Sequence, residues 1–226
     1  MTSTSDAARD LAGEGAPSGS WVTADTQSRG RGRGGHGWVS LRGNFHASLI
    51  IRPVAPIDPP SALAFVAALA VAETLEPYHP VQLKWPNDVL AAAAGRKIAG
   101  ILVEPDTKSG AVIIGFGINL AGAPDGAVSL AELTGDAPAP NALLDPLAGA
   151  FAAWMARLSG LGFTAVRVAW TDRAYGIGAR AFVTIGTQRI YGTVRGLASD
   201  GALMFQTDDG PLTVHSGSLT FKESNG

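Results

Sequence analysis

Two apolar stretches near the middle of the chain decide the fold: KIAGILVEP at 97–105 and AVIIGFG at 111–117. The second is almost wholly apolar, as expected of a central strand that is covered on both faces. In the first, Lys97 shares one face with Ala99 and Ile101, which is the two-residue period of a strand. The two stretches therefore predict strands in the middle of a β-sheet.

Other strands and several helices are predicted on either side of this centre. Strands are expected at 21–24, 45–51, 81–84 and 89–90. Helices are expected at 4–12, 59–77, 129–133, 141–158 and 164–174. Strands interleaved with helices predict an α/β chain of the α+β type, with a mixed β-sheet flanked by helices.

The pattern changes after Gly176. Short alternating stretches, AFVTIG, QRIYGTVRGL, GALMFQT and PLTVHSG, are separated there by Gly and Asp-Gly turns. Such a meander is typical of a small β-barrel. We therefore expect two domains, residues 1–176 and residues 177–226.

Composition limits the classes of function. At 226 residues and 46% hydrophobic, the chain can bury a large core. The net charge of -2 argues against a general nucleic-acid binder, and the absence of cysteine excludes disulfides, zinc-thiolate sites and thiol catalysis. The apolar run at 59–77 falls short of the ~20 apolar residues of a membrane span, and no secretory signal is present, so a cytoplasmic protein is expected.

Four segments carry residue types suited to chemistry. The first, QSRGRGRGGHGW at 27–38, combines glycines, which let a backbone approach a ligand closely, with arginines, which bind phosphate through paired N–H groups. The second, KWPNDVL at 84–90, places an amide and a carboxylate side by side on a proline-stiffened turn. Taken alone, the first would most often be a surface linker and the second an ordinary turn.

The third and fourth segments lie on the two central strands. GRKIAGILVE at 95–104 opens with Lys97 and leaves the opposite face bare at Gly100, while GFGIN at 115–119 ends a buried strand with glycines and an asparagine. A lysine at a strand start is usually just solvated, and an asparagine at a strand end is usually a cap. Each segment is a weak signal by itself, but their joint order and spacing are specific.

Together the four segments resemble the biotin protein ligase family (biotin–acetyl-CoA-carboxylase ligases). Members carry a GRGRxGRxW loop, a KWPNDV turn, a GRKxAGIL strand and a G-x-GxN strand. The likeness runs from roughly residue 3 to residue 119, and the tail resembles the family's small SH3-like barrel. The resemblance implies a catalytic domain like that of class II aminoacyl-tRNA synthetases, in a monofunctional form without an N-terminal DNA-binding domain.

The resemblance also implies a reaction in two steps. The carboxylate of biotin attacks the α-phosphorus of ATP, giving biotinyl-5'-AMP and pyrophosphate, and a lysine of a biotin carboxyl carrier protein then attacks the mixed anhydride and releases AMP. Because an anion must approach a triphosphate, catalysis is mainly positioning and charge neutralisation. ATP and biotin are the implied substrates, Mg²⁺ offsets the triphosphate charge, and the implied partner is the carrier domain of acetyl-CoA or acyl-CoA carboxylase.

The family pattern assigns site residues by position. Lys97 and Arg31 would be catalytic, and Asp88 is a candidate metal ligand. The biotin-binding residues would be Ser3, Thr4, Gln27, Gly30, Arg31, Arg33, Lys97 and Gly100. The ATP-binding residues would be Arg31, Arg33, Trp38, Asn87, Lys97 and Asn119.

The chain departs from the family pattern in two places. Its opening motif reads TSTS at 2–5, where the family has Asp-Ser-Thr-Asn after a strand, so we expect a start without that strand. In the loop, His36 stands where the family has a third arginine. This predicts weaker and pH-sensitive ATP binding, because histidine becomes charged near pH ~6.5.

Three other functions fit parts of the sequence. A lipoate or octanoate protein ligase would share the fold class and the adenylate intermediate. An Arg-Gly RNA-binding module would need a basic excess and more aromatic side chains beside the loop. A catalytically idle biotin-binding homologue is the third. We expect no nucleic acid or membrane partner, and either a monomer or a homodimer.

Overall fold

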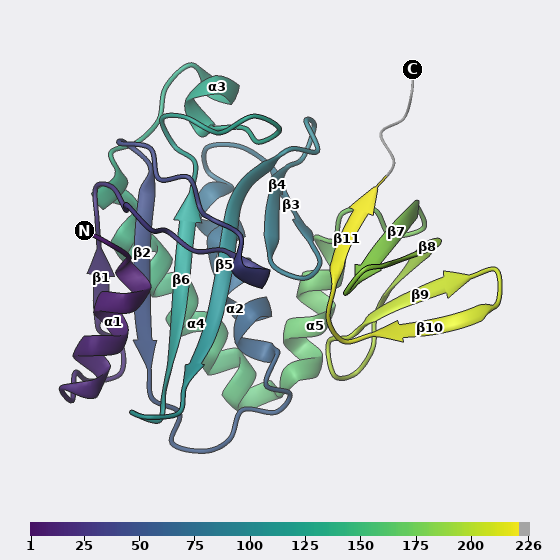
Figure 1. The fold of residues 1–226 in the computed structure, drawn as a ribbon, viewed down its shortest axis with the longest axis horizontal. Helices are drawn as coiled ribbons and strands as arrows, with labels where there is room; N and C mark the ends of the chain where they lie inside the picture. The colour runs from purple at the N-terminus through teal and green to yellow at the C-terminus, as the bar shows by residue number, and fades with distance from the viewer. Residues whose placement is uncertain (222–226) are drawn as a thin grey trace.

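The computed structural model describes residues 1–221 (Figure 1). The helices of this range are α1 (Thr4–Gly13), α2 (Ala62–Leu75), α3 (Leu130–Thr134), α4 (Leu144–Leu161) and α5 (Phe163–Asp172), with 3₁₀ turns at Arg33–Gly35 and Pro140–Leu143. The strands are β1 (Trp21–Thr23), β2 (Phe45–Ile51), β3 (Val81–Lys84), β4 (Asp88–Ala91), β5 (Lys97–Asp106), β6 (Ala111–Ile118), β7 (Arg180–Ile185), β8 (Gln188–Leu197), β9 (Leu203–Thr207), β10 (Gly210–Val214) and β11 (Ser218–Phe221).

The first six strands form one sheet in the order β1-β2-β6-β5-β4-β3, and every neighbouring pair is antiparallel. The predicted class of helices around a β-sheet is confirmed, but the prediction of mixed strand directions is wrong. Part of the reason is the shortness of two connections. Residues 85–87 join β3 to β4 and residues 107–110 join β5 to β6, and hairpins of this length join antiparallel strands.

The register of the central strands leaves a bare strip of backbone on one face. Gly100 of β5 pairs with Gly117 of β6, and Gly115 pairs with Ser48 of β2. Directly paired residues of antiparallel strands point to the same face, so the glycines lie next to one another there. No side chain rises from the three glycines, so a ligand or an aromatic ring can rest on the backbone of the strands there.

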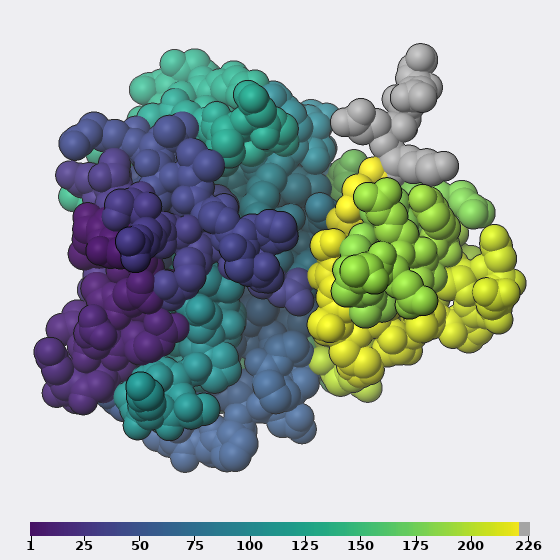
Figure 2. Space-filling view, in the orientation of Figure 1, coloured from purple at the N-terminus to yellow at the C-terminus, as the bar shows by residue number. Residues whose placement is uncertain are grey.

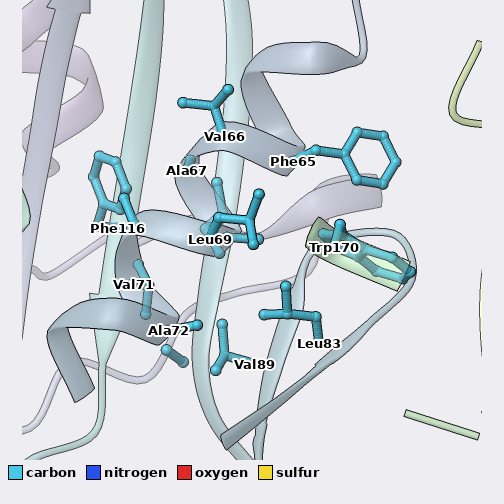
Figure 3. Packing of buried hydrophobic residues seen from close by; sticks show 14 of the residues in the cluster. Phe65, Val66, Ala67, Leu69, Val71, Ala72, Leu83, Val89, Phe116 and Trp170 are labelled. Atoms are coloured by element: carbon cyan, nitrogen blue, oxygen red, sulfur yellow. The ribbon is translucent and has the colours of Figure 1, made fainter. Parts of the chain in front are cut away.

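Helix α2 is buried around nearly its whole circumference, because its alanine-rich sequence packs against the sheet on one side and against α4 and α5 on the other. Figure 3 shows Leu69 and Val71 of α2 in the same cluster as Phe116 of β6. At the far end of this layer Phe65 meets Trp170 of α5 edge to face, with ring centroids 5.4 Å apart. This is the main hydrophobic core.

Helix α1 covers the opposite face of the sheet. Its Ala8 and Ala12 pack with Ile50 of β2 and Ile113 of β6, which are cross-strand partners. The Oγ of Ser3 caps the helix by accepting from the N–H of Asp6. The packing therefore brings the N-terminus of α1 to the edge of the bare strip.

The C-terminal strands form a second sheet in the order β10-β9-β8-β7-β11, again antiparallel throughout. It sits on one side of the first sheet (Figure 1) and contacts it through a hydrogen bond from Trp85 Nε1 to Gly201 O of 3.3 Å. An edge-to-face contact between Tyr175 and Phe221 adds to this interface. The boundary at 176/177 stays a prediction, and the last five residues of the predicted domain 177–226 lie outside the described residues.

Most predicted helices agree with the structure to within a few residues. The largest difference is at 141–158, where residues up to Leu143 form a 3₁₀ turn and the α-helix runs on to Leu161. In the described part of the chain, no helix combines the length and the hydropathy that crossing a membrane requires.

Candidate active site

A cleft of about 640 Å³ opens on the α1 face of the first sheet and extends to the second sheet. Its lining comprises Thr4 and Ser5 of α1, Gln27, Ala47 of β2, most of 31–38, 84–88, Lys97, 100–102, 115–117, 184–186 and 216–219. In Figure 2 the loop that follows β1 lies across the teal strands β5 and β6 and reaches toward the yellow C-terminal sheet. The cleft thus has a floor of sheet, a cover of loop and a wall from the C-terminal sheet.

One end of the cleft is lined by uncharged polar groups that hold one another in place. Gln27 Oε1 accepts from the N–H of Thr4 at 2.8 Å and from Thr4 Oγ1 at 3.1 Å, while Gln27 Nε2 donates to Ser40 Oγ. Ser48 Oγ donates to Thr4 Oγ1 at 2.9 Å and is 3.1 Å from Ser5 Oγ. This end offers hydrogen-bond donors and acceptors in fixed directions without a net charge.

Arg31 marks the transition from this polar end to a charged end. Its Nη1 lies 2.6 Å from Asp6 Oδ1, and its Nη2 lies 3.4 Å from Glu104 Oε2. Burial acts to lower the pKa of Arg31, but the hydrogen bond to Asp6 and the charge of Glu104 outweigh it, so the pKa is raised. The guanidinium is therefore always charged and is held from two sides.

Arg33 connects the loop to the second sheet. Its Nη1 donates to the backbone oxygen of Gly217 at 2.9 Å. Desolvation lowers the pKa of Arg33, although the charge of Asp88 acts in the opposite direction. A partly desolvated cation with a single neutral partner is well suited to bind a ligand anion, because the anion restores the solvation that the protein removes.

Lys97 stands at the start of β5 with its ammonium group over the floor of the cleft. Its Nζ lies 2.5 Å from Asp88 Oδ1, and the other oxygen of Asp88 lies 3.5 Å from Lys84 Nζ. Leu90 of β4 is the strand partner of Lys97, and a β-bulge between Val89 and Leu90 shifts the register there. The turn before β4 brings Asp88 back toward Lys97. One carboxylate thus orients two lysines, and this corner of the cleft keeps a net positive charge.

The indole of Trp38 rests on the bare strip of glycines. A Cβ at Gly117 would overlap two carbons of the indole, and one at Gly100 would lie 3.1 Å from a third. The ring centroid is 5.5 Å from Lys97 Nζ, a cation–π distance. A side chain at position 117 would displace the ring from these strands, and one at position 100 would crowd it.

Nine of the predicted site residues meet in the cleft: Thr4, Gln27, Arg31, Arg33, Trp38, Asn87, Asp88, Lys97 and Gly100. Ser3, Gly30 and Asn119 do not line it. Ser3 caps α1 instead. Gly30 is a close-approach position, since a Cβ there would meet Trp38 O at 2.8 Å. Asn119 is buried, and its Nδ2 donates to Val128 O at 3.3 Å.

Sequence reasoning missed several residues that build the cleft: Asp6, Ser40, Ser48, Glu104, Gly115 and Gly117. Only the glycines carried a signal, because a GFG run at the end of a buried strand indicates close approach to the backbone. Asp6 and Glu104 are ordinary charged residues in the sequence, and their role depends on which residue they face.

Within residues 1–221 no three His, Cys, Asp or Glu side chains gather as they would around a metal ion. Asp88 is the acidic residue in the lining of the cleft, and both of its oxygens are paired with lysines.

Comparison with known proteins agrees with this geometry. The model of the Biotin/lipoate A/B protein ligase family matches residues 1–119. The biotin–[acetyl-CoA-carboxylase] ligase of Paracoccus denitrificans is 39% identical over 218 residues, which cover 89% of this chain and 90% of that protein. The chain belongs to the biotin/lipoate protein ligase family.

Two further relatives extend the likeness over nearly the whole chain. The bifunctional ligase/repressor BirA of Bacillus subtilis is 34% identical, and the match covers 97% of this chain and 71% of that protein. The biotin protein ligase of Aquifex aeolicus, solved in complex with biotin and ATP, is 26% identical with a TM-score of 0.85, over 98% of this chain and 95% of that one. The expected fold, with a C-terminal β unit, is confirmed by this match.

Proposed function

We propose that the protein attaches biotin to a lysine of a biotin carboxyl carrier protein, using ATP and passing through biotinyl-5'-AMP. One observation carries the proposal: a single cleft joins a neutral polar end, built by Thr4 and Gln27, to a cationic end with Arg31, Arg33 and Lys97. Biotin has the same two halves. Its ureido ring needs donors and acceptors, and its carboxylate must be brought to a phosphate.

In the first step the carboxylate of biotin attacks the α-phosphorus of ATP, and pyrophosphate leaves. In this proposal Lys97 contacts both the carboxylate and the α-phosphate, and Asp88 keeps its ammonium in place. Arg31 and Arg33 reduce the repulsion between the two anions from the loop side. None of these residues forms a covalent bond, so their contribution is charge stabilisation and alignment.

The nucleotide has a place in the cleft beside Trp38 and Lys97. We assign Trp38 as the ring that stacks on adenine, because its indole lies flat against the glycines at the floor of the cleft. Asn87 is next to this region, although its Nδ2 donates to Ile101 O at 2.6 Å, which leaves its carbonyl oxygen for the ligand. An ATP-reading role for Asn119 has less support, since it does not line the cleft.

In the second step the acceptor lysine attacks the carbonyl of the adenylate, an amide bond forms, and AMP leaves. Until then the mixed anhydride must be kept from water. The glycine-rich loop lies over the cleft and is tied to the second sheet through Arg33 and Gly217, so loop and sheet together shield the intermediate.

The remaining parts of the proposal concern conditions and partners. We propose the carrier domain of acetyl-CoA or acyl-CoA carboxylase as the acceptor, because the Paracoccus denitrificans relative is named for acetyl-CoA carboxylase. Mg²⁺ would enter with ATP, with Asp88 as a protein ligand or organiser. We further propose that the protein acts in the cytoplasm as a monomer or homodimer, without nucleic acid.

Biotin is favoured over lipoate within the family. The polar end of the cleft suits a ureido ring, whereas the dithiolane ring of lipoate has no N–H or carbonyl group to match Thr4 and Gln27. The Paracoccus denitrificans and Aquifex aeolicus relatives described above are also named as biotin ligases. Lipoate is therefore the competing substrate that an assay has to include.

The test is transfer of biotin to an acceptor. The protein is incubated with biotin, Mg-ATP and a biotin carboxyl carrier domain, and the product is detected with streptavidin. A carrier domain whose acceptor lysine is replaced by arginine is the matched control, and lipoate replaces biotin in a parallel reaction. We expect product with biotin and the intact carrier alone. Absence of product from folded protein, or equal transfer of lipoate, would contradict the proposal.

A further inference from the structure

Arg31 shares both of its carboxylate partners with a second arginine. Asp6 Oδ1 is 2.6 Å from Arg31 Nη1 and 3.1 Å from Arg9 Nη1. Glu104 Oε2 is 3.4 Å from Arg31 Nη2 and 3.3 Å from Arg9 Nη2. The four side chains form a closed ring of alternating charge, which we call the Arg31 cradle (Asp6, Arg9, Arg31 and Glu104). Each is between 27% and 40% exposed, so the ring is only partly open to water.

The cradle joins three elements that are distant in sequence. Asp6 and Arg9 belong to α1, Glu104 belongs to β5, and Arg31 belongs to the glycine-rich loop. Other backbone bonds at this part of the loop are internal to it: Gly32 N–H donates to His36 O, and Trp38 N–H donates to Gly30 O. The loop is thus folded on itself, and Arg31 ties that folded unit to the body of the protein.

We propose that Asp6 and Glu104 are positioning residues for Arg31, holding its guanidinium at the mouth of the cleft and keeping the loop closed over it. A guanidinium has five N–H donors, and the two contacts to the carboxylates leave others for a ligand anion. Asp6 and Glu104 themselves do not line the cleft, so they act on the ligand through Arg31. The kinetic consequences of this proposal rest on the proposed function, whereas the loop's closure does not.

Within the cradle, Arg9 competes with Arg31 for the two carboxylates. It draws on the same carboxylate oxygens as Arg31 and does not line the cleft. Removing a carboxylate loosens Arg31, whereas removing Arg9 leaves both carboxylates to Arg31 and holds it at least as firmly. Replacing a carboxylate and replacing Arg9 should therefore have opposite effects on how firmly Arg31 is held. A general loss of packing would not produce opposite effects.

The first test measures closure of the loop in the protein without substrates. Hydrogen exchange of the backbone amides at 31–37 is compared between wild type, Asp6→Asn, Glu104→Gln and Arg9→Gln. Ion pairs of this exposure change an equilibrium by about twofold to fivefold. We expect exchange faster by that factor in the two carboxylate variants, and unchanged or slower exchange in Arg9→Gln. Equal acceleration in all three variants, or in none, overturns the proposal.

The second test measures whether Asp6 and Glu104 act through Arg31. Glu104→Gln should raise the KM for ATP about twofold to fivefold while kcat stays within about twofold. It should also raise the labelling of a bystander protein relative to the carrier domain. In an Arg31→Gln background the same change should have no further effect on either quantity. Additive effects in the double variant would show that Glu104 acts independently of Arg31 and would refute the proposal.

The two tests separate failure of this proposal from failure of the proposed function. If wild type transfers no biotin, the labelling experiment is lost for every variant, but the exchange rates still decide whether the carboxylates hold the loop. If Asp6→Asn lowers the yield of folded protein by weakening the start of α1, Glu104→Gln on β5 carries the same prediction by itself.

Discussion

Replacing Lys97 with methionine removes one positive charge from the cleft while keeping an unbranched side chain of similar length. Lys97 Nζ is 2.5 Å from Asp88 Oδ1 and 5.5 Å from the centroid of Trp38. The variant keeps the packing of the stem on Gly100, where an added Cβ would meet the lysine side chain at 3.0 Å. The change is thus directed at the charge.

The size of the effect follows from the position of the ammonium group. A unit charge about 4 Å from a phosphate oxygen, at an effective dielectric constant of about 20, is worth about 4 kcal/mol. Asp88 offsets part of this, and if it offsets half, about 2 kcal/mol remains. A loss between these limits slows adenylate formation by about 30-fold to 900-fold, since each ~1.4 kcal/mol is a factor of ten.

The assay is single-turnover formation of biotinyl-5'-AMP with saturating biotin and Mg-ATP. Lys84→Met is the matched control, because Lys84 pairs with the other oxygen of the same carboxylate at 3.5 Å. We expect less than about fivefold loss for Lys84→Met and measurable biotin binding in both variants. Equal losses in the two variants would refute the special position of Lys97, and so would a rate for Lys97→Met within about threefold of wild type.

Three further changes test other parts of the site. Gln27→Leu removes the acceptor of both Thr4 hydrogen bonds and should raise the KM for biotin about tenfold; an unchanged KM would contradict the polar end of the cleft. Arg33→Ala removes the bond to Gly217 O and should increase labelling of a bystander protein several-fold, so labelling confined to the carrier would count against the shield. Burial lowers the pKa of His46 in the folded protein. Below pH ~6.5 the unfolded chain therefore binds a proton at this histidine more readily than the folded protein does, and the stability of the fold decreases as the pH falls. The thermal midpoint of His46→Gln should therefore fall less between about pH 7 and pH 5; an equal fall would exclude this cause.

The place of the cations in the cleft could be predicted from the sequence because their spacing is local. Lys97 sits in a strand segment with Gly100, and Arg31 and Arg33 sit in one loop, so a short motif fixes each of them. The helices and strands followed for the same reason, since periodicity of two or 3.6 residues is a local property. Strand direction was not local: mixed directions were expected, and every neighbouring pair of the sheet is antiparallel.

The partners of those cations could not be read from the sequence. Asp6 and Glu104 matter because α1 and β5 both pack beside the loop, and nothing in either segment indicates this. Trp38 was expected to bind ATP, but the position of its indole on Gly117 depends on the register of β5 and β6. Asn119 is the opposite case, because the sequence motif suggested a site residue that the fold places elsewhere. Its side chain is buried and hydrogen-bonds to Asn44 and Val128.

The central claim is that one cleft activates the carboxylate of biotin with ATP. Exchange of labelled pyrophosphate into ATP measures that step alone, because it needs neither the carrier protein nor the second half of the reaction. We expect exchange that requires biotin, is absent without it, and is not supported at a comparable rate by lipoate or octanoate. Exchange that proceeds equally without biotin, or folded protein that shows none with it, would contradict the claim.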